Sequence, residues 1–316
     1  MRPGQRSWTR SVLAAAALAW LGLGPILPAS VAEARPPRLN GSPEEIYKTF
    51  VDALRAGDRA AMLKMLGPEA SDVVTSGDDV ADRQTWRRFV EKYDQAHKLE
   101  AAGGKVVLVV GSDDFPMPIP LVPDAEGWRF DTEAGRQEIL KRRVGRNELN
   151  VIQVCLAYVD AQREYYTLLT RGKSGLFEYA QRIRSTPGKR DGLHWPTKAG
   201  EPPSPLGDLA ARARSEGYRA QDRPTPYHGY FFRVLTAQGP DAPGGTYDYV
   251  VRGHMIGGFA LVAFPASYGD SGIMTFIVNH DGIVYQKDLG PETSRIAQTM
   301  KVYNPDASWR RAESAR

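Results

Sequence analysis

Three apolar segments between residues 227 and 288 constrain the fold more than any other part of the sequence. They read YHGYFFRVLTAQG, GGFALVAFPASYGDSG and IMTFIVNHDGIVYQKDLG, and Gly, Pro, Asn and Asp separate the apolar runs. Such runs are typical of consecutive strands joined by tight turns, and Asp281-Gly282 predicts a hairpin because these residues tolerate positive φ. We expect an antiparallel meander that holds the main core. Its strands are expected at residues 230–235, 247–252, 258–264, 274–279 and 283–287, the second pairing with the first.

A long helical region is expected before this sheet. Apolar residues recur at helical spacing across residues 148–170. Thr132 can cap a preceding helix over residues 132–144, and Gly145 predicts a kink or a break between the two. Shorter helices are expected at residues 174–184, 206–215 and 291–300, with Trp309 docked near the end and frayed residues after it.

The first third of the chain begins with local signals for helices. Ser42, Pro43 and Glu45 are typical of a capping box that opens a helix. Asp58 can cap a second helix over residues 59–66. A third helix is expected at residues 82–96, and strands at residues 105–111, 117–122 and 127–130.

Together these patterns predict an α+β fold class. N-terminal helices with a small curved antiparallel sheet precede a long helix that packs on an antiparallel β-meander. Length allows about two domains, which we place at residues 35–131 and 132–316. Residues 186–227 are rich in Pro, Gly and charged residues and form a long loop in the second domain.

The N-terminus has the three parts of a secretory signal peptide. Arg2, Arg6 and Arg10 precede an apolar stretch rich in Ala and Leu, and Ala32-Glu33-Ala34 supplies the small residues that a signal peptidase reads. We expect a signal at residues 1–34, cleavage after Ala34, and a periplasmic or secreted protein without a stable membrane span. An uncleaved membrane anchor is the alternative.

Charge and cysteine content exclude several classes. Removal of residues 1–34 leaves 38 basic and 36 acidic side chains, a net charge of +2. This balance argues against a nucleic-acid partner. Cys155 is the only cysteine, so an intramolecular disulfide is excluded, and its apolar neighbours predict a buried residue.

The N-terminal part resembles a known fold. The stretch PEEIYKTFVDALRAGDRAAMLKML, followed by a sheet that ends in Gly-Trp-Arg-Phe-Asp, is similar to the nuclear-transport-factor-2-like cone. The resemblance covers residues 42–131 and implies a fold that often holds a small ligand. The aromatic residues expected to line its pocket, unless they only fill the core, are Trp86, Tyr93, Trp128 and Phe130.

The second part resembles the globular part of type IV pilins and pseudopilins in its order of long helix, variable loop and meander. A pilin has its apolar assembly helix at the mature N-terminus, where this chain has a whole domain. The resemblance therefore implies a pilin-like fold and not filament assembly.

The whole chain resembles one bacterial family. The strings NELNVIQVCLAYVDAQREYY, DGLHWP, PYHGYFFRVLTAQGP and NPDASW, together with the meander, are similar to the family called domain of unknown function 2950. This resemblance covers most of residues 40–312. It implies an exported protein of Gram-negative bacteria and no known reaction.

Catalytic and metal-binding motifs are weak in this sequence. Ser271 lies in Gly-Asp-Ser-Gly, which surrounds the nucleophile of trypsin-like proteases, but no matching His and Asp framework precedes it, so residues 269–272 are interpreted as a turn. His228, His254 and His280 lie near the sheet without ligand-like spacing, so neither a metal nor a cofactor is expected.

Two functions remain open. The first is a non-catalytic envelope protein that binds a partner protein or a small ligand, or that acts as a scaffold. The second is a periplasmic hydrolase that uses His194 or His254 with Asp270 or Asp281. The hydrolase requires these side chains to converge in one cleft.

Overall fold

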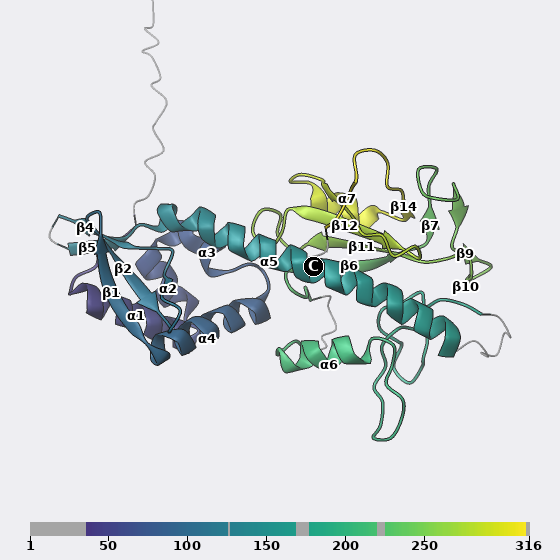
Figure 1. The fold of residues 1–316 in the computed structure, drawn as a ribbon, viewed down its shortest axis with the longest axis horizontal. Helices are drawn as coiled ribbons and strands as arrows, with labels where there is room; N and C mark the ends of the chain where they lie inside the picture. The colour runs from purple at the N-terminus through teal and green to yellow at the C-terminus, as the bar shows by residue number, and fades with distance from the viewer. Residues whose placement is uncertain (1–35, 126, 169–176, 220–224, 314–316) are drawn as a thin grey trace, which may run out of the picture. The chain divides into compact units, whose positions relative to one another are not determined.

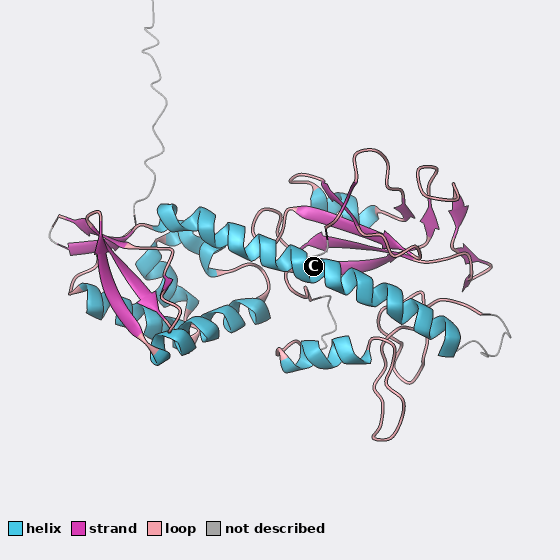
Figure 2. Cartoon of the chain, viewed as in Figure 1, coloured by secondary structure: helices cyan, strands magenta, loops and turns pink. Residues whose placement is uncertain are grey.

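The computed structural model describes residues 36–125, 127–168, 177–219 and 225–313, and the predicted signal at residues 1–34 lies outside them (Figure 1). Two hydrophobic cores form in the described part. One lies among the N-terminal helices and sheet, and the other lies against the C-terminal sheet. The α+β class is confirmed (Figure 2).

The first two helices begin where the sequence predicts. In α1, Pro43–Ala56, the Ser42 hydroxyl accepts from the Glu45 N–H, and the Glu45 carboxylate accepts from the Ser42 N–H. The Asp58 carboxylate caps α2, Arg59–Leu66, by accepting from the Ala61 N–H. A 3-10 turn and a short helix follow, η1 Pro68–Ala70 and α3 Ser71–Val74.

Helix α4, Asp79–Gln95, begins three residues before the predicted start. The reason is Asp78, whose side chain accepts from the Val80 and Ala81 N–H groups and so caps the helix earlier. Asp78 is 2% exposed, and its other carboxylate oxygen accepts from the Tyr218 hydroxyl and the Gly229 N–H. The start of α4 is thereby attached to residues far along the chain.

The N-terminal sheet is antiparallel and has the order β1-β2-β4-β5, with β3 also paired to β2. Its first strand was not predicted, because HKLEAA is polar and mostly exposed. The single strand predicted at residues 117–122 is wrong in its first half, where Pro118 and Pro120 lack the N–H that a strand donates. The strands are β1 His97–Ala102, β2 Lys105–Val110, β3 Phe115–Pro116, β4 Leu121–Asp124 and β5 Gly127–Phe130.

One helix, α5, runs without interruption through Thr132–Leu168. The predicted break at Gly145 is wrong. A mid-helix Gly costs only about 1 kcal/mol, and buried Val144 and Asn147 hold the helix on both sides of it. The C-terminal half of α5 packs against the sheet through Val151, Ile152 and Cys155. Burial raises the pKa of the Cys155 thiol to about 12, so the predicted buried cysteine is confirmed.

The C-terminal sheet is the predicted meander, with the order β15-β13-β12-β11-β6 and antiparallel pairing throughout. Gly282 has φ +78° in the predicted hairpin turn between β12 and β13. Residues 310–311, which were expected to fray, form the edge strand. The strands are β6 Tyr230–Leu235, β11 Ala260–Pro265, β12 Met274–Asn279, β13 Tyr285–Asp288 and β15 Arg310–Arg311.

Residues 247–252 do not pair with β6 as predicted. They divide into two short strands, because β8 pairs with β7 and β9 pairs with β10. The remaining elements are β7 Ala237–Gln238, β8 Tyr247–Asp248, β9 Val250–Val251, β10 His254–Met255, α7 Thr293–Thr299 and β14 Val302–Tyr303.

The helix predicted at residues 174–184 is absent from its described part, residues 177–184. Ala180 there bonds through both its N–H and its carbonyl to the Gln162 side chain of α5, and the Tyr179 N–H donates to Met255. These tertiary bonds replace helical ones. The helix predicted at residues 206–215 is confirmed as α6, Gly207–Ser215.

Candidate functional site

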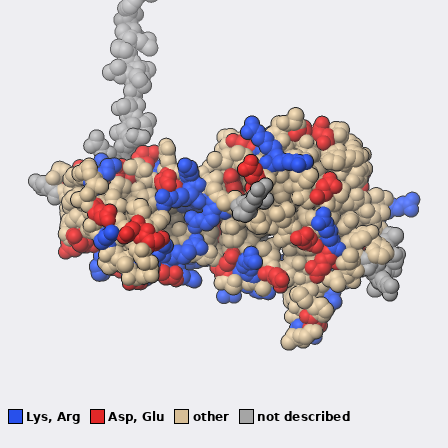
Figure 3. Space-filling view, viewed as in Figure 1, with Lys and Arg blue, Asp and Glu red and all other residues tan. Residues whose placement is uncertain are grey.

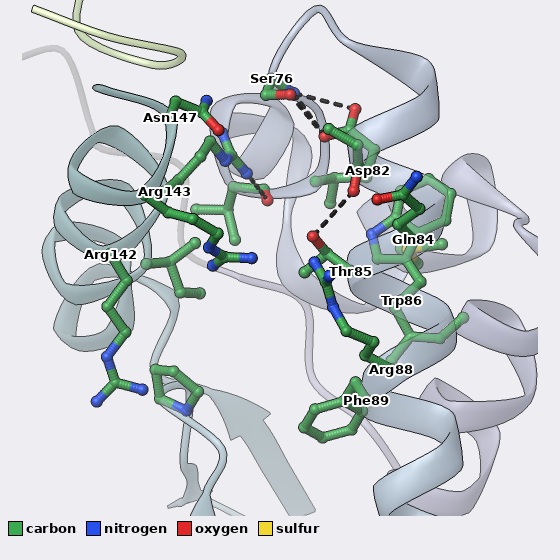
Figure 4. A pocket seen from close by; sticks show the side chains of 18 of the residues that line it. Ser76, Asp82, Gln84, Thr85, Trp86, Arg88, Phe89, Arg142, Arg143 and Asn147 are labelled. Atoms are coloured by element: carbon green, nitrogen blue, oxygen red, sulfur yellow. Dashed lines mark hydrogen bonds between the residues drawn. The ribbon is translucent and has the colours of Figure 1, made fainter. Parts of the chain in front are cut away.

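A cavity of about 500 Å³ lies between α4 and α5 (Figure 4). This volume is within the range of small-molecule sites, roughly 300–1,000 Å³. Much of its wall is apolar and comes from α1, α2, α4, α5 and the segment around β3. Large apolar members of this wall are Phe50, Met62, Trp86, Phe89, Phe115 and Met117.

Arginine side chains surround the apolar wall. Arg88 comes from α4, and Arg142, Arg143 and Arg146 come from α5, where LKRRVGRN places them within two turns. Figure 4 shows Arg88 on α4 and Arg142 and Arg143 on α5 beside the cavity. Figure 3 shows Lys and Arg side chains gathered over α4 and the facing part of α5. The local charge is therefore positive, although the whole chain is nearly balanced.

Two of these arginines have partners within the protein. Arg142 pairs with Glu138 at 2.6 Å and lies over the Phe115 ring. Arg143 donates to the Asp72 and Val73 carbonyls at the end of α3, at 2.6 and 2.7 Å. Desolvation lowers the pKa of the Arg143 guanidinium, although nearby carboxylates act in the other direction. Its contacts are backbone carbonyls, which leave its charge unneutralised.

Arg88 and Arg146 differ from them, because neither forms an ion pair with any residue that the structure describes. The surrounding protein atoms, followed by the positive charges of Arg88 and Arg143, lower the pKa of Arg146. Like charges that face a cavity are unfavourable unless an anion joins them. Arg212 of α6 also lines the cavity and forms no ion pair with a described residue. The cavity therefore offers three unpaired guanidinium groups beside an apolar wall.

Two acidic residues, Asp82 and Glu216, line the cavity, and Asp82 is already engaged. Buried Asp82 accepts from the Ser76 N–H and hydroxyl and from the Thr75 hydroxyl, and it lies 3.5 Å from Arg59. The Thr85 hydroxyl donates to the Ala81 carbonyl. The Ser76 and Thr75 hydroxyls therefore donate to a carboxylate and the Thr85 hydroxyl donates to the backbone. This arrangement suits binding better than acid–base chemistry.

One histidine lies at the edge of the cavity. His228 Nε2 is 3.4 Å from Glu216 Oε2. Burial lowers the pKa of His228, although the Glu216 and Asp78 carboxylates act in the other direction. His228 was considered in the sequence only as a metal ligand. No group of three metal-binding side chains occurs in the described residues.

Of the aromatic residues predicted to line a pocket, only Trp86 lines this cavity. Tyr93 stacks on His97 at 3.9 Å between ring centroids. Phe130 is fully buried against Tyr47 and Phe50, as a core residue. Trp128 pairs through its backbone with Leu39.

The side chains proposed for a hydrolase form hydrogen bonds with other residues and none with one another. His194 Nδ1 lies 3.0 Å from the Ser204 hydroxyl, and His254 Nδ1 lies 2.9 Å from Glu178. Asp270 accepts from the Ser267 hydroxyl, and Asp281 accepts from the Asn279 amide. Within the described residues each candidate therefore has its own, unrelated partner.

Gly-Asp-Ser-Gly forms the predicted turn between β11 and β12. The Ser271 hydroxyl is buried, donates to the Ser267 carbonyl and accepts from the Ser267 N–H. The Ser271 carbonyl accepts from Asn147 of α5 at 2.9 Å. This serine stabilises a turn against the long helix and has no histidine partner among the described residues.

The basic residues of the cavity were missed in the sequence. Arg87-Arg88 follows Trp86 on one predicted helix, and three arginines recur between residues 142 and 146 on another. Basic residues at helical spacing beside apolar ones are a visible signal. The sequence did not indicate that the two helices face each other.

Among the described helices, none is long and apolar enough to cross a membrane. Comparison with curated proteins and with solved structures found no match. The likenesses to the nuclear-transport-factor-2-like cone and to the pilin-like fold therefore stay predictions.

A family model that spans both hydrophobic cores matches residues 38–312. It also covers the arginines of the cavity, the Gly-Asp-Ser-Gly turn and the long helix α5. The chain therefore belongs to the family described as protein of unknown function (DUF2950).

Proposed function

We propose that this protein is an exported, non-catalytic binding protein whose small ligand occupies the cavity between α4 and α5. The observation that carries the proposal is a cavity of about 500 Å³ with a largely apolar wall. Burial of an apolar ligand surface there gives roughly 25 cal/mol per Å² of favourable free energy. The separate partners of His194, His254, Asp270 and Asp281 favour binding over the hydrolase alternative.

Filling the cavity tests this function. Ala81 lines the cavity on α4, and Ala81→Phe is expected to weaken binding of the neutral apolar dye Nile red at least tenfold. The added ring would occupy the space that the dye needs. Fluorescence titration of the full chain gives the dissociation constant.

Ala60→Phe is the matched control, because Ala60 is exposed on helix α2 and does not line the cavity. Its affinity for Nile red should equal that of the unaltered protein. The proposed function would be contradicted if Ala81→Phe left the affinity for Nile red unchanged. It would also be contradicted if the unaltered protein showed no saturable binding of Nile red.

The proposal that the protein is exported rests on the basic N-terminus, the apolar stretch and Ala32-Glu33-Ala34. Expression in a Gram-negative host should give a mature protein that begins at Arg35. Intact-mass spectrometry of the purified protein checks this. A mass that retains residues 1–34 would contradict cleavage and support an uncleaved anchor.

A further inference from the structure

Two of the unpaired arginines that line the cavity, Arg88 and Arg146, indicate the chemical class of the ligand. Arg88 and Arg146 stand on different helices and line the same cavity. Each is close enough to the other for the Arg88 charge to affect the titration of Arg146. Folding alone gains nothing from bringing two such groups together, because like charges repel.

Three other arginines of the N-terminal helices and α5 have acidic partners, whereas Arg83 and Arg87 of α4 have none among the described residues but do not line the cavity. Arg59 pairs with Asp79, Arg136 pairs with Asp72, and Arg142 pairs with Glu138. No carboxylate in the described residues neutralises Arg88 or Arg146 in this way. Guanidinium groups bind carboxylates and phosphates through paired hydrogen bonds, so an anionic group is the partner they would take.

The wall below these arginines cannot solvate a second charge. Phe50, Met62, Trp86 and Met117 are buried apolar side chains that line it. A charged group placed among them would lose its hydration without replacement. A ligand that satisfies both regions therefore has a charged end and an apolar end.

We propose that the ligand is an anionic amphiphile, whose carboxylate or phosphate head group lies between Arg88 and Arg146 and whose apolar body fills the cavity. This inference rests on the proposed function and specifies its ligand class. The head group contributes charge-assisted hydrogen bonds, and the body contributes apolar burial.

Three probes with the same twelve-carbon chain test the proposal. Laurate, dodecyl phosphate and 1-dodecanol are titrated by calorimetry into the full chain, below the concentrations at which they form micelles. Laurate or dodecyl phosphate is expected to bind at least tenfold more tightly than 1-dodecanol. Their affinity should fall as salt rises, because salt screens exposed charges, whereas that of 1-dodecanol should not fall. Whichever of laurate and dodecyl phosphate binds with the lower dissociation constant identifies the head group as a carboxylate or a phosphate.

Arg88→Gln and Arg146→Gln are each expected to weaken anion binding roughly tenfold, since each removes one charge-assisted pair. The double variant should lose most of the preference for the anion over the alcohol, and the remaining preference would come from Arg143 and Arg212. Arg83→Gln is the matched control, because Arg83 is an exposed arginine on α4 that does not line the cavity. It should bind all three probes like the unaltered protein.

The outcomes separate this inference from the proposed function. If 1-dodecanol binds as tightly as the anions, or if Arg83→Gln weakens anion binding as much as Arg88→Gln, the head-group assignment is wrong while the apolar cavity stands. If neither Nile red nor any of the three probes binds, the proposed function itself is wrong. Circular dichroism of each variant confirms that its fold is retained.

Discussion

Replacement of Asp78 by Ala is expected to lower the free energy of unfolding by about 3 kcal/mol or more. One carboxylate oxygen of Asp78 caps α4, and the other accepts from the Tyr218 hydroxyl and the Gly229 N–H. An N-cap contributes about 1 kcal/mol, and each hydrogen bond to a charged group contributes about 1.5–3 kcal/mol. Alanine would also leave two buried donors without an acceptor. Urea denaturation measures the loss.

Asp58→Ala is the matched control for this prediction. Asp58 also caps a helix, but it is exposed and accepts only from Ala61. Its replacement should cost only about 1 kcal/mol. The difference between the two variants measures the bonds from Tyr218 and Gly229. Equal losses would show that Asp78 acts as a helix cap alone and contributes little to the attachment of distant segments.

The caps explain how far the sequence could predict the N-terminal fold. Ser42 and Asp58 were identified correctly because a capping side chain bonds within three residues of itself. Asp78 follows the same local rule, but the apolar spacing of the sequence favours a later start at residue 82. Its bonds to Tyr218 and Gly229 join segments about 140 and 150 residues apart, and such pairings have no local signature.

Other errors arose where tertiary packing outweighed a local preference. Gly145 has a low helix propensity, but Asn147 beside it bonds to Ser271 and holds α5 against the C-terminal half of the chain. Ala180 lies in a segment with helical spacing, but Gln162 takes both of its backbone groups. The meander was predicted well because apolar runs and turn residues agree there.

The candidate site was less predictable than the fold. The cone resemblance implies a pocket lined by Trp86, Tyr93, Trp128 and Phe130, and of these only Trp86 lines the cavity. The nearly balanced net charge of the chain gives no information about where basic side chains cluster, so it did not indicate the arginines of the cavity. Arg88 and Arg146 are 58 positions apart, and only the packing of the N-terminal elements brings them to one cavity.

The Gly-Asp-Ser-Gly turn should be far more sensitive at its last glycine than at its serine. A Cβ on Gly272 would lie 2.0 Å from the Tyr230 hydroxyl oxygen and 2.4 Å from the ring carbon that carries it. Tyr230 is fully buried and donates to the Met274 carbonyl, so it has no room to move. Gly272→Ala is expected to lower the free energy of unfolding by about 3 kcal/mol.

Two variants in the same turn make this prediction specific. Gly269 has φ +87° and no atom within 4 Å of an added Cβ, so Gly269→Ala should cost only the backbone strain, about 1–2 kcal/mol. Ser271→Ala removes hydroxyl bonds to Ser267 and should cost about 1 kcal/mol. Urea denaturation of the three variants should therefore rank Gly272→Ala as the most destabilised. A Gly272→Ala protein as stable as Ser271→Ala would mean that Tyr230 can move aside. Close packing against Tyr230 would then not be the reason for a glycine at position 272.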